Sequence, residues 1–235
     1  MLIVKPSHEI LSELSGGLVA KDTGIEGVSK FVSQLPALRE LRLIEKAART
    51  CYRSEDKCTD DGESAMRLEA KLIESGHEAM LEHSSLTVKF VCDRGVSHEL
   101  VRHRMASFAQ ESQRYCNYSK GKFDRQIKVI CPPDIQEGTD AYNAWSCAMV
   151  VCENAYFRML ETGVTPQIAR SVLPNATATT IVVTANYREW RHILRLRCAK
   201  DAHPQMRELM IPLLRELKNK IPVLFDDINE GENEQ

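Results

Sequence analysis

The sequence lacks any segment that could cross a membrane or direct export. Its longest apolar runs, such as Ile181–Ala185, are far shorter than the roughly 20 residues that a bilayer-spanning helix needs. The N-terminus has no charged region followed by an apolar one, which a secretory signal would require. We therefore expect a cytoplasmic protein without a membrane partner.

The eight cysteines form neither a metal motif nor a dense disulfide framework. They are scattered between Cys51 and Cys198, and no C-x-x-C pair occurs among them. Small secreted domains use closely spaced, paired cysteines, so the pattern excludes that class of protein. We expect reduced thiols, most of them buried.

Glycine-rich phosphate cradles are also absent, because the chain contains no G-x-G-x-x-G and no P-loop. Any dinucleotide must then be held by side chains. The net charge of -2 and the 6% of aromatic residues argue against a nucleic-acid-binding module, which works through positive charge and stacking. That module is still the main non-enzymatic alternative, because basic residues gather in two stretches of the chain.

The 235 residues are 43% hydrophobic, which is enough apolar sequence to bury a core. No repeat or low-complexity linker divides them, so we predict one domain over residues 1–225. Residues 226–235 are acidic and should form a frayed tail.

Hydrophobic periodicity predicts a mixed α/β (α+β) fold, with a sheet flanked by helices. Two segments have the alternation or the β-branched content of strands, and they span residues 86–92 and 177–185. Helical spacing of apolar residues, preceded by capping residues such as Asp93 and Asn186, predicts the helices. These cover 36–48, starting at Pro36, then 64–75, 97–102, 139–162, 165–174 and 186–197, with a last helix that begins at His203.

The first basic stretch is "RHRMASFAQESQRY", Arg102–Tyr115, which holds three arginines and one histidine with a single acid. We expect it to form a polar loop after the short helix. Arginines that converge on one loop suit phosphate or carboxylate oxygens, and Gln110 and Ser112 add neutral groups that could orient a polar ligand. The alternative is an exposed basic loop whose charges pair with nearby acids.

The second basic stretch lies on the predicted helix after Asn186. Arg188, His192 and Arg195 fall on one helical face, whereas Arg197 lies nearer the apolar face. An unpaired buried guanidinium is costly. Arg197 therefore meets either a protein carboxylate or a ligand.

Histidines and glutamates between His77 and His83 could suggest zinc. The H-E-x-x-H spacing is missing, however, and no cysteine pair supplements these residues. We expect no metal site. His77 then packs on, or hydrogen-bonds to, a neighbour or a cofactor.

Arg102, His103 and Arg104, followed by seven residues and Ser112, resemble the signature of the flavin-dependent thymidylate synthases. The resemblance extends to "GHEAMLEH" at 76–83, "ARSVLP" at 169–174 and "NYREWRHILRLR" at 186–197, in the order and approximate spacing of that family. It covers most of the chain from about Ala47 to His203.

The resemblance implies a homotetramer in which FAD and dUMP bind at sites shared between subunits. Members of the family transfer the methylene of methylenetetrahydrofolate to C5 of dUMP. They reduce it to a methyl group with electrons that NADPH has delivered to the flavin. The products are dTMP and tetrahydrofolate.

The resemblance also assigns roles to single residues. Flavin-binding positions match His77, Glu82, Arg102, His103, Arg104, Gln110, Asn186, Arg188 and His192. Substrate-binding positions match Glu99, Arg102, Gln110, Glu111, Ser112, Gln113, Arg114, Arg170 and Arg197. Arg197 matches the catalytic arginine that activates the uracil ring. Two positions depart from the family's pattern: Glu99 replaces a common glutamine, and Ala79 replaces a common serine or threonine.

Ser112 is not expected to be a nucleophile, because its neighbours Glu111, Gln113 and Arg114 include no histidine base. We therefore expect reduction by the flavin without a covalent bond between enzyme and substrate. A second alternative is a flavoprotein of the same ancestry that acts on another nucleotide.

Overall fold

The computed structural model describes residues 1–12, 38–119 and 124–231. The predicted helix start at Pro36 and the end of the acidic tail, 232–235, lie outside these residues. The chain divides into two compact units, which we call the sheet unit and the helical unit. The sheet unit contains Met1–Glu9, Val88–Val183 and His203–Leu209. The helical unit contains Ile10–Thr87, Thr184–Ala202 and Met210–Gln235.

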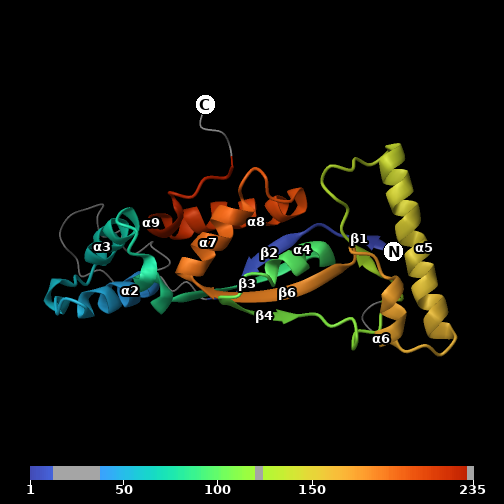
Figure 1. The fold of residues 1–235 in the computed structure, drawn as a ribbon, viewed down its shortest axis with the longest axis horizontal. Helices are drawn as coiled ribbons and strands as arrows, with labels where there is room; N and C mark the ends of the chain where they lie inside the picture. The colour runs from blue at the N-terminus through green and yellow to red at the C-terminus, as the bar shows by residue number, and fades with distance from the viewer. Residues whose placement is uncertain (13–37, 120–123, 232–235) are drawn as a thin grey trace. The chain divides into compact units, whose positions relative to one another are not determined.

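A four-stranded sheet has the strand order β2-β3-β6-β4. Its central strands are β3 (Ser85–Asp93) and β6 (Ala178–Asn186), and its edge strands are β2 (Ser7–Ile10) and β4 (Ala106–Gln110) (Figure 1). Both predicted strands are therefore confirmed, and they are the two central ones. The mixed α/β class with a sheet flanked by helices is confirmed as well.

In strand β3, the alternation of residue types in the sequence matches the burial of the side chains. Its even-numbered residues from Leu86 to Cys92 are buried, whereas Thr87, Lys89 and Val91 are half-buried. Successive side chains of a strand point to opposite faces, so the alternation in sequence becomes an alternation in burial. Trp190 Nε1 donates to the Leu86 carbonyl oxygen at 2.9 Å, which anchors a helix to this strand.

Strand β4 corrects the prediction of a polar loop over Arg102–Tyr115. Residues Ala106–Gln110 form an edge strand in which half-buried and exposed residues alternate. Phe108 is its one large apolar residue, and the other four are Ala, Ser, Ala and Gln, so the strand has little hydrophobic signal. Pairing with the rest of the sheet, and not local propensity, holds it in an extended conformation.

The sheet unit also contains a small parallel pair, in which β1 (Leu2–Ile3) pairs with β5 (Lys128–Val129). The short helix α4 (Arg94–Leu100) follows β3, and Asp93 caps it by accepting from Val96 N at 2.9 Å. This cap was predicted. Arg102 lies beyond the end of α4.

The longest helix is α5 (Asp140–Glu161), which runs beside α6 (Pro166–Ala169) and the 3-10 turn η4 (Arg170–Val172) (Figure 1). Thr139 caps α5, and Gly163 ends it with a φ of +89°, a conformation that glycine adopts without strain. Both limits agree with the predicted helix. The core of this unit contains Tyr118, Ile127, Val129, Met149, Tyr156, Phe157 and Ala169.

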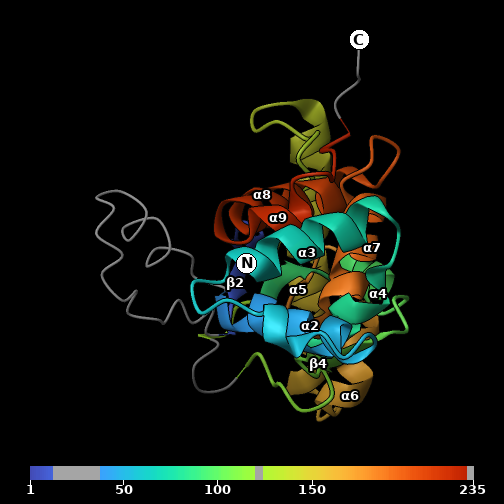
Figure 2. The same cartoon turned by 90° about the vertical axis from the view of Figure 1, so that its left-hand side faces the viewer.

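The helical unit contains α2 (Leu38–Thr50), α3 (Glu63–Glu74) and α7 (Tyr187–Arg197), all of which were predicted. Helices α2 and α3 pack side by side, as Figure 2 shows. Two 3-10 turns, η1 (Glu55–Lys57) and η2 (Glu78–His83), were not predicted.

Helix α8 (Pro204–Lys220) begins one residue after the predicted start, and its residues are divided between the two units. It is not the last helix, because α9 (Pro222–Phe225) follows it. Four residues are too few to show helical periodicity, which explains the omission.

Glu69 on α3 is fully buried, and neither of its carboxylate oxygens has a hydrogen-bond partner among the described residues. Burial, and secondarily the charge of Glu45, raises the pKa of Glu69 to about 9. Glu45 is itself buried and accepts from Arg49 at 2.7 Å. Glu69 should therefore be a neutral acid in the folded protein near pH 7.

We expect Glu69→Gln to weaken the pH dependence of stability. The free energy of unfolding of the variant should fall less than that of the wild type as pH rises. The raised pKa means that the Glu69 contribution is intact below about pH 4.5, falls as pH increases, and is fully lost above about pH 9. Within that window the folded chain holds a proton that the unfolded chain has released. Each pH unit then costs up to about 1.4 kcal/mol. The free energy of unfolding against pH should have a flatter slope in the variant, by denaturant titration.

Glu74→Gln is the matched control, since Glu74 is exposed at the end of the same helix. Its pH slope should equal that of the wild type. An unchanged slope in Glu69→Gln would show that Glu69 is ionised in the folded protein.

All eight cysteines are free thiols, in agreement with the predicted reduced state. The expectation that most are buried is wrong, because only Cys92 and Cys198 are buried and Cys51 and Cys147 are exposed. Among the described residues, no helix is both long and apolar enough to span a bilayer. The cytoplasmic location stays a prediction.

Candidate functional site

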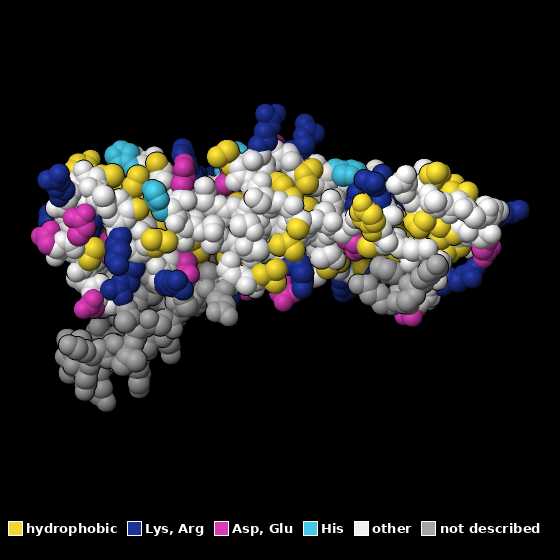
Figure 3. Space-filling view, turned by 90° about the horizontal axis from the view of Figure 1, so that it is seen from below, with side chains coloured by type: hydrophobic (Ala, Val, Ile, Leu, Met, Phe, Trp, Pro, Cys, Tyr) yellow, Lys and Arg dark blue, Asp and Glu magenta, His cyan; other side chains and the backbone are white. Residues whose placement is uncertain are grey.

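The residues predicted to bind ligands fall into two sets, one in each unit, and each set is described separately. The sheet unit contains Glu99, Arg102, His103, Arg104, Gln110, Glu111, Ser112, Gln113, Arg114 and Arg170. The helical unit contains His77, Glu82, Asn186, Arg188, His192 and Arg197. On the face shown in Figure 3, Lys and Arg side chains are mixed with Asp and Glu side chains.

In the sheet unit, Gln110 is held by a small polar network. Its Nε2 donates to Ser97 Oγ at 2.9 Å and approaches Thr179 Oγ1 at 3.4 Å. Ser97 is fully buried on α4 and donates to the Arg94 carbonyl oxygen at 2.9 Å. The sequence had indicated Gln110 but not Ser97, Thr179 or Arg94. The contacts of Gln110 with Ser97 and Thr179 join segments 13 and 69 residues apart, so they depend on the tertiary fold.

The turn after β4 presents Ser112 and Arg114. Glu111 N donates to the Thr180 carbonyl oxygen at 2.8 Å, and Glu111 Oε1 accepts from the Tyr118 hydroxyl at 3.2 Å. Ser112 Oγ accepts from Arg114 N at 3.3 Å, and this hydrogen bond helps to hold the turn. The Arg114 side chain is exposed, which leaves its guanidinium available to an anion from solution.

Arg102 and Arg104 are exposed, whereas His103 between them is buried, with 5% of its surface accessible. Arg170 is half-buried and begins η4 in the same unit. The sheet unit therefore contains several guanidinium groups as well as polar side chains that hydrogen bonds hold in place. This is the composition expected of a site for an anionic ligand.

Glu99 on α4 is paired with His203, whose Nδ1 lies 3.3 Å from Glu99 Oε1. Both side chains are partly exposed. The sequence had not indicated His203 as a partner. Whether Glu99 contacts a ligand stays a prediction.

In the helical unit, the end of η2 meets the start of α7 at Glu82 and Arg188. Arg188 Nη1 donates to Glu82 Oε1 at 2.5 Å, although 106 residues separate them in the chain. Both side chains are about half exposed. Two residues predicted to bind the same ligand are thus neighbours in space.

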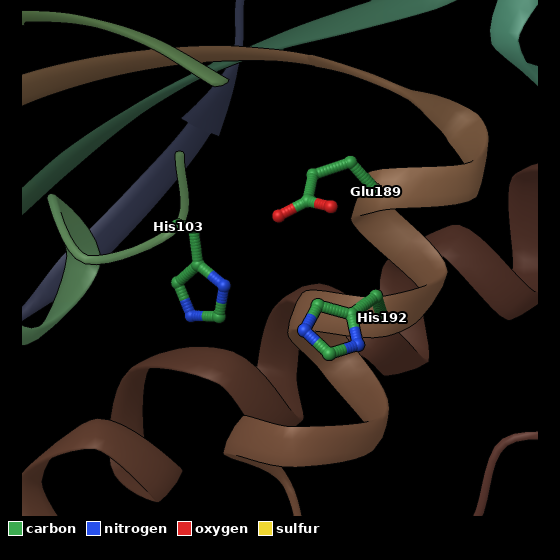
Figure 4. A group of neighbouring side chains, drawn as sticks. All are labelled: His103, Glu189 and His192. Atoms are coloured by element: carbon green, nitrogen blue, oxygen red, sulfur yellow. The ribbon is translucent and has the colours of Figure 1, made fainter. Parts of the chain in front are cut away.

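Asn186 caps helix α7, and its Oδ1 accepts from Glu189 N at 2.8 Å. This cap was predicted, and it leaves the amide nitrogen of Asn186 able to donate to a ligand. Glu189 and His192 project from successive turns of α7 (Figure 4). Burial raises the pKa of Glu189, and the nearby charge of His192 partly opposes that effect.

The arginine that α7 buries completely is Arg191, whereas Arg197 is half-buried. Sequence reasoning had singled out Arg197 as the arginine nearest the apolar face. Arg188, His192 and Arg195, which the sequence places on one helical face, are exposed. Arg191 received no role because its partners, Glu78 and Asp227, are distant in sequence.

In the segment from His77 to His83, both carboxylates, those of Glu78 and Glu82, accept hydrogen bonds from arginines. Glu82 accepts from Arg188, and Glu78 accepts from Arg191 and Arg195. His77 is exposed immediately before η2. These pairings show that Glu78 and Glu82 serve to join η2 to α7.

Comparison with known proteins gives a consistent result. A family model described as thymidylate synthase complementing protein matches residues 36–223. The flavin-dependent thymidylate synthase of Geobacter sulfurreducens is 36% identical over 195 residues, covering 80% of this chain and 82% of that protein. That of Corynebacterium aurimucosum is 36% identical over 200 residues, covering 80% and 79%.

A similar fold occurs in a solved structure, a UMP/dUMP methylase, PolB, from Streptomyces cacaoi. Its complex with 5-Br UMP has a TM-score of 0.68 and 22% identity, covering 96% of this chain and 94% of that chain. Its complex with 5-Br dUMP has the same TM-score and 24% identity, covering 96% of each chain. At this identity the likeness shows the fold.

Proposed function

This chain belongs to the flavin-dependent thymidylate synthase family, and we propose that it converts dUMP to dTMP with FAD as its cofactor. Methylenetetrahydrofolate would donate the carbon as a methylene group, and NADPH would supply the electrons that reduce it to a methyl group. Tetrahydrofolate is the second product. We further propose a homotetramer in which neighbouring subunits complete each site.

The observation that carries the proposal is the 2.5 Å contact between Glu82 and Arg188. Each lies in one of the segments that resemble the family's flavin-binding segments, and the fold brings these segments together. In the sheet unit, the exposed guanidinium groups of Arg102 and Arg104 also suit an anionic pyrophosphate. Asn186, which caps α7, and His192 on α7 add further polar side chains. The residues present therefore fit FAD.

When bound and reduced by NADPH, the flavin would supply the hydride that completes the methyl group. The chain's own residues hold the nucleotide. We assign the phosphate of dUMP to Ser112, Arg114 and Arg170, which offer a hydroxyl, backbone donors and two guanidinium groups. Gln110, fixed by Ser97, would orient the nucleotide from the end of β4.

Arg197 would activate the uracil ring. C5 of uracil is a weak nucleophile, and a guanidinium beside the ring carbonyl and N3 stabilises the negative charge that develops as C5 attacks. The half-buried position of Arg197 reduces the screening of this charge by water. A planar guanidinium can pair with two ring atoms, which an ammonium group cannot do in the same geometry.

We propose that no side chain attacks C6 of the uracil. Ser112 is the one hydroxyl among the proposed substrate-binding residues, and its oxygen accepts from the Arg114 amide. A donor to this oxygen lowers its nucleophilicity, whereas activation requires a base that accepts the hydroxyl proton. Ser112 is thus suited to binding.

Absorbance and turnover of the purified protein test the proposed function. A yellow solution with flavin absorbance, and dTMP formation that requires dUMP, methylenetetrahydrofolate and NADPH, are the expected results. A colourless protein that takes up no added FAD would instead favour the nucleic-acid-binding alternative. If the rate of flavin oxidation did not change on adding dUMP and the folate, a related flavoprotein that acts on another nucleotide would be favoured.

Ser112→Ala should weaken dUMP binding by roughly tenfold while turnover persists at saturating dUMP. The variant loses one hydrogen bond to a charged group, worth about 1.5 kcal/mol. Calorimetric titration gives the dUMP affinity, and dTMP formation gives kcat. Ser119→Ala is the control, because the Ser119 hydroxyl contacts Asn117 at 2.7 Å and has no assigned ligand role. Complete loss of turnover with dUMP still bound would restore the nucleophile hypothesis.

A further inference from the structure

Arg191 on α7 forms the most extensively paired buried charge that the described residues contain. Its side chain is fully inaccessible to solvent. Nη1 and Nη2 donate to Asp227 Oδ1 and Oδ2 at 2.8 and 2.7 Å, which makes a two-point pair. Nε and Nη2 donate to Glu78 Oε1 at 3.2 and 3.1 Å, and Nη1 also donates to the Leu224 carbonyl oxygen.

These contacts use all five N–H groups of the guanidinium. Full pairing offsets the cost of removing the charge from water, which otherwise makes a buried arginine strongly destabilising. Lysine offers three donors from a single atom, so it could not reach the same acceptors.

Arg195 completes a balanced group of two cations and two anions. One turn after Arg191, its Nη2 donates to Glu78 Oε1 and to Asp227 Oδ2, both at 3.0 Å. Burial alone would raise the pKa of each carboxyl, but the two arginines outweigh it and hold the pKa values of Glu78 and Asp227 below their usual range. Both acids therefore stay ionised at neutral pH.

The cluster joins the elements that carry the proposed flavin-binding residues. Glu78 is the first residue of η2, which lies directly after His77 and contains Glu82. Arg191 lies on α7, which begins next to Asn186 and contains Arg188 and His192. The Glu82–Arg188 contact is half exposed, so by itself it restrains these elements weakly. Asp227 adds a third segment, just after α9.

We infer that Arg191, clamped by Glu78 and Asp227, is a positioning residue that holds η2 and α7 in the relative placement needed for FAD binding. This inference rests on the proposed function, since it requires FAD to contact both elements. It also gives the segment after α9 a role in cofactor binding, although Asp227 itself need not touch the cofactor. Binding groups held in place before the ligand arrives lose less entropy on binding.

The test compares FAD and dUMP affinities in full-length Arg191→Lys and Asp227→Asn, each titrated well below its melting temperature. Both variants should weaken FAD binding by roughly tenfold or more, because each loses hydrogen bonds between charged groups. Affinity for dUMP, whose proposed phosphate ligands lie in the sheet unit, should change less than about twofold. The circular dichroism of the bound flavin should change as well.

Asp226→Asn is the matched control, because Asp226 is exposed beside Asp227. It should bind FAD like the wild type, and Asp227→Glu, which keeps a carboxylate, should recover most of the affinity. If Arg191→Lys fails to fold, the FAD affinity and flavin spectrum of Asp227→Asn are sufficient to test the positioning role. Wild-type FAD affinity and flavin spectrum in Asp227→Asn, with only a lower melting temperature, would reduce the cluster to a stabilising role. A wild-type protein that binds no FAD would instead refute the proposed function.

Discussion

Arg197→Lys should reduce dTMP formation by about 100-fold to 1000-fold while FAD stays bound. A preorganised donor that stabilises charge in the transition state is worth about 3 to 4 kcal/mol, and lysine keeps the charge but loses the planar pairing. The effect should fall on kcat more than on the affinity for dUMP, because the negative charge on the ring is greatest in the transition state. Steady-state kinetics and flavin absorbance of the same preparation provide both measurements.

Arg158→Lys is the control for this substitution. Arg158 is exposed on α5 and has no assigned ligand role, so the variant should turn over like the wild type. Near-normal turnover in Arg197→Lys would remove the activating role. Loss of FAD from that variant would show that Arg197 acts through the cofactor site.

Arg170→Gln should weaken dUMP binding by roughly 10-fold to 100-fold. Charge-assisted hydrogen bonds to a phosphate contribute about 1.5 to 3 kcal/mol, and glutamine retains a donor without the charge. Arg170 is half-buried at the start of η4, where water screens its charge less than at an exposed site. Calorimetric titration with dUMP measures the change.

Deoxyuridine, which lacks the phosphate, separates a phosphate contact from a general disturbance. Its weak binding should be equal in the wild type and in Arg170→Gln. Arg158→Gln, the exposed control, should leave both affinities unchanged. If Arg170→Gln weakened deoxyuridine as strongly as dUMP, the assignment of Arg170 to the phosphate would be wrong.

The central parts of the fold were predictable because their signals are local. Strand β3 alternates in burial from Ser85 to Cys92, and the side chains of Thr139 and Asn186 cap the starts of α5 and α7. The edge strand β4 was missed because Phe108 is the one large apolar residue in Ala106–Gln110. An edge strand needs less apolar surface than a central one, so the alternation that identified β3 is weak there.

The sequence allowed the residues of the candidate site to be predicted, but not the contacts between them. The sequence contained the spacing of Arg102, Arg104 and Ser112 and its resemblance to a family. It contained no sign that Gln110 meets Ser97 or that Glu99 meets His203, because those pairs depend on how the chain folds back on itself.

By itself, the sequence determined the mixed fold class, the two central strands, most of the helices and the family, because periodicity, caps and residue spacing are properties of short segments. Only the tertiary structure decided which arginine of α7 is buried. Helical position had favoured Arg197, but Arg191 is the one that meets Glu78, 113 residues away, and Asp227, 36 residues away. A buried charge is stable only where its counter-charges converge, and that convergence is a property of the folded chain.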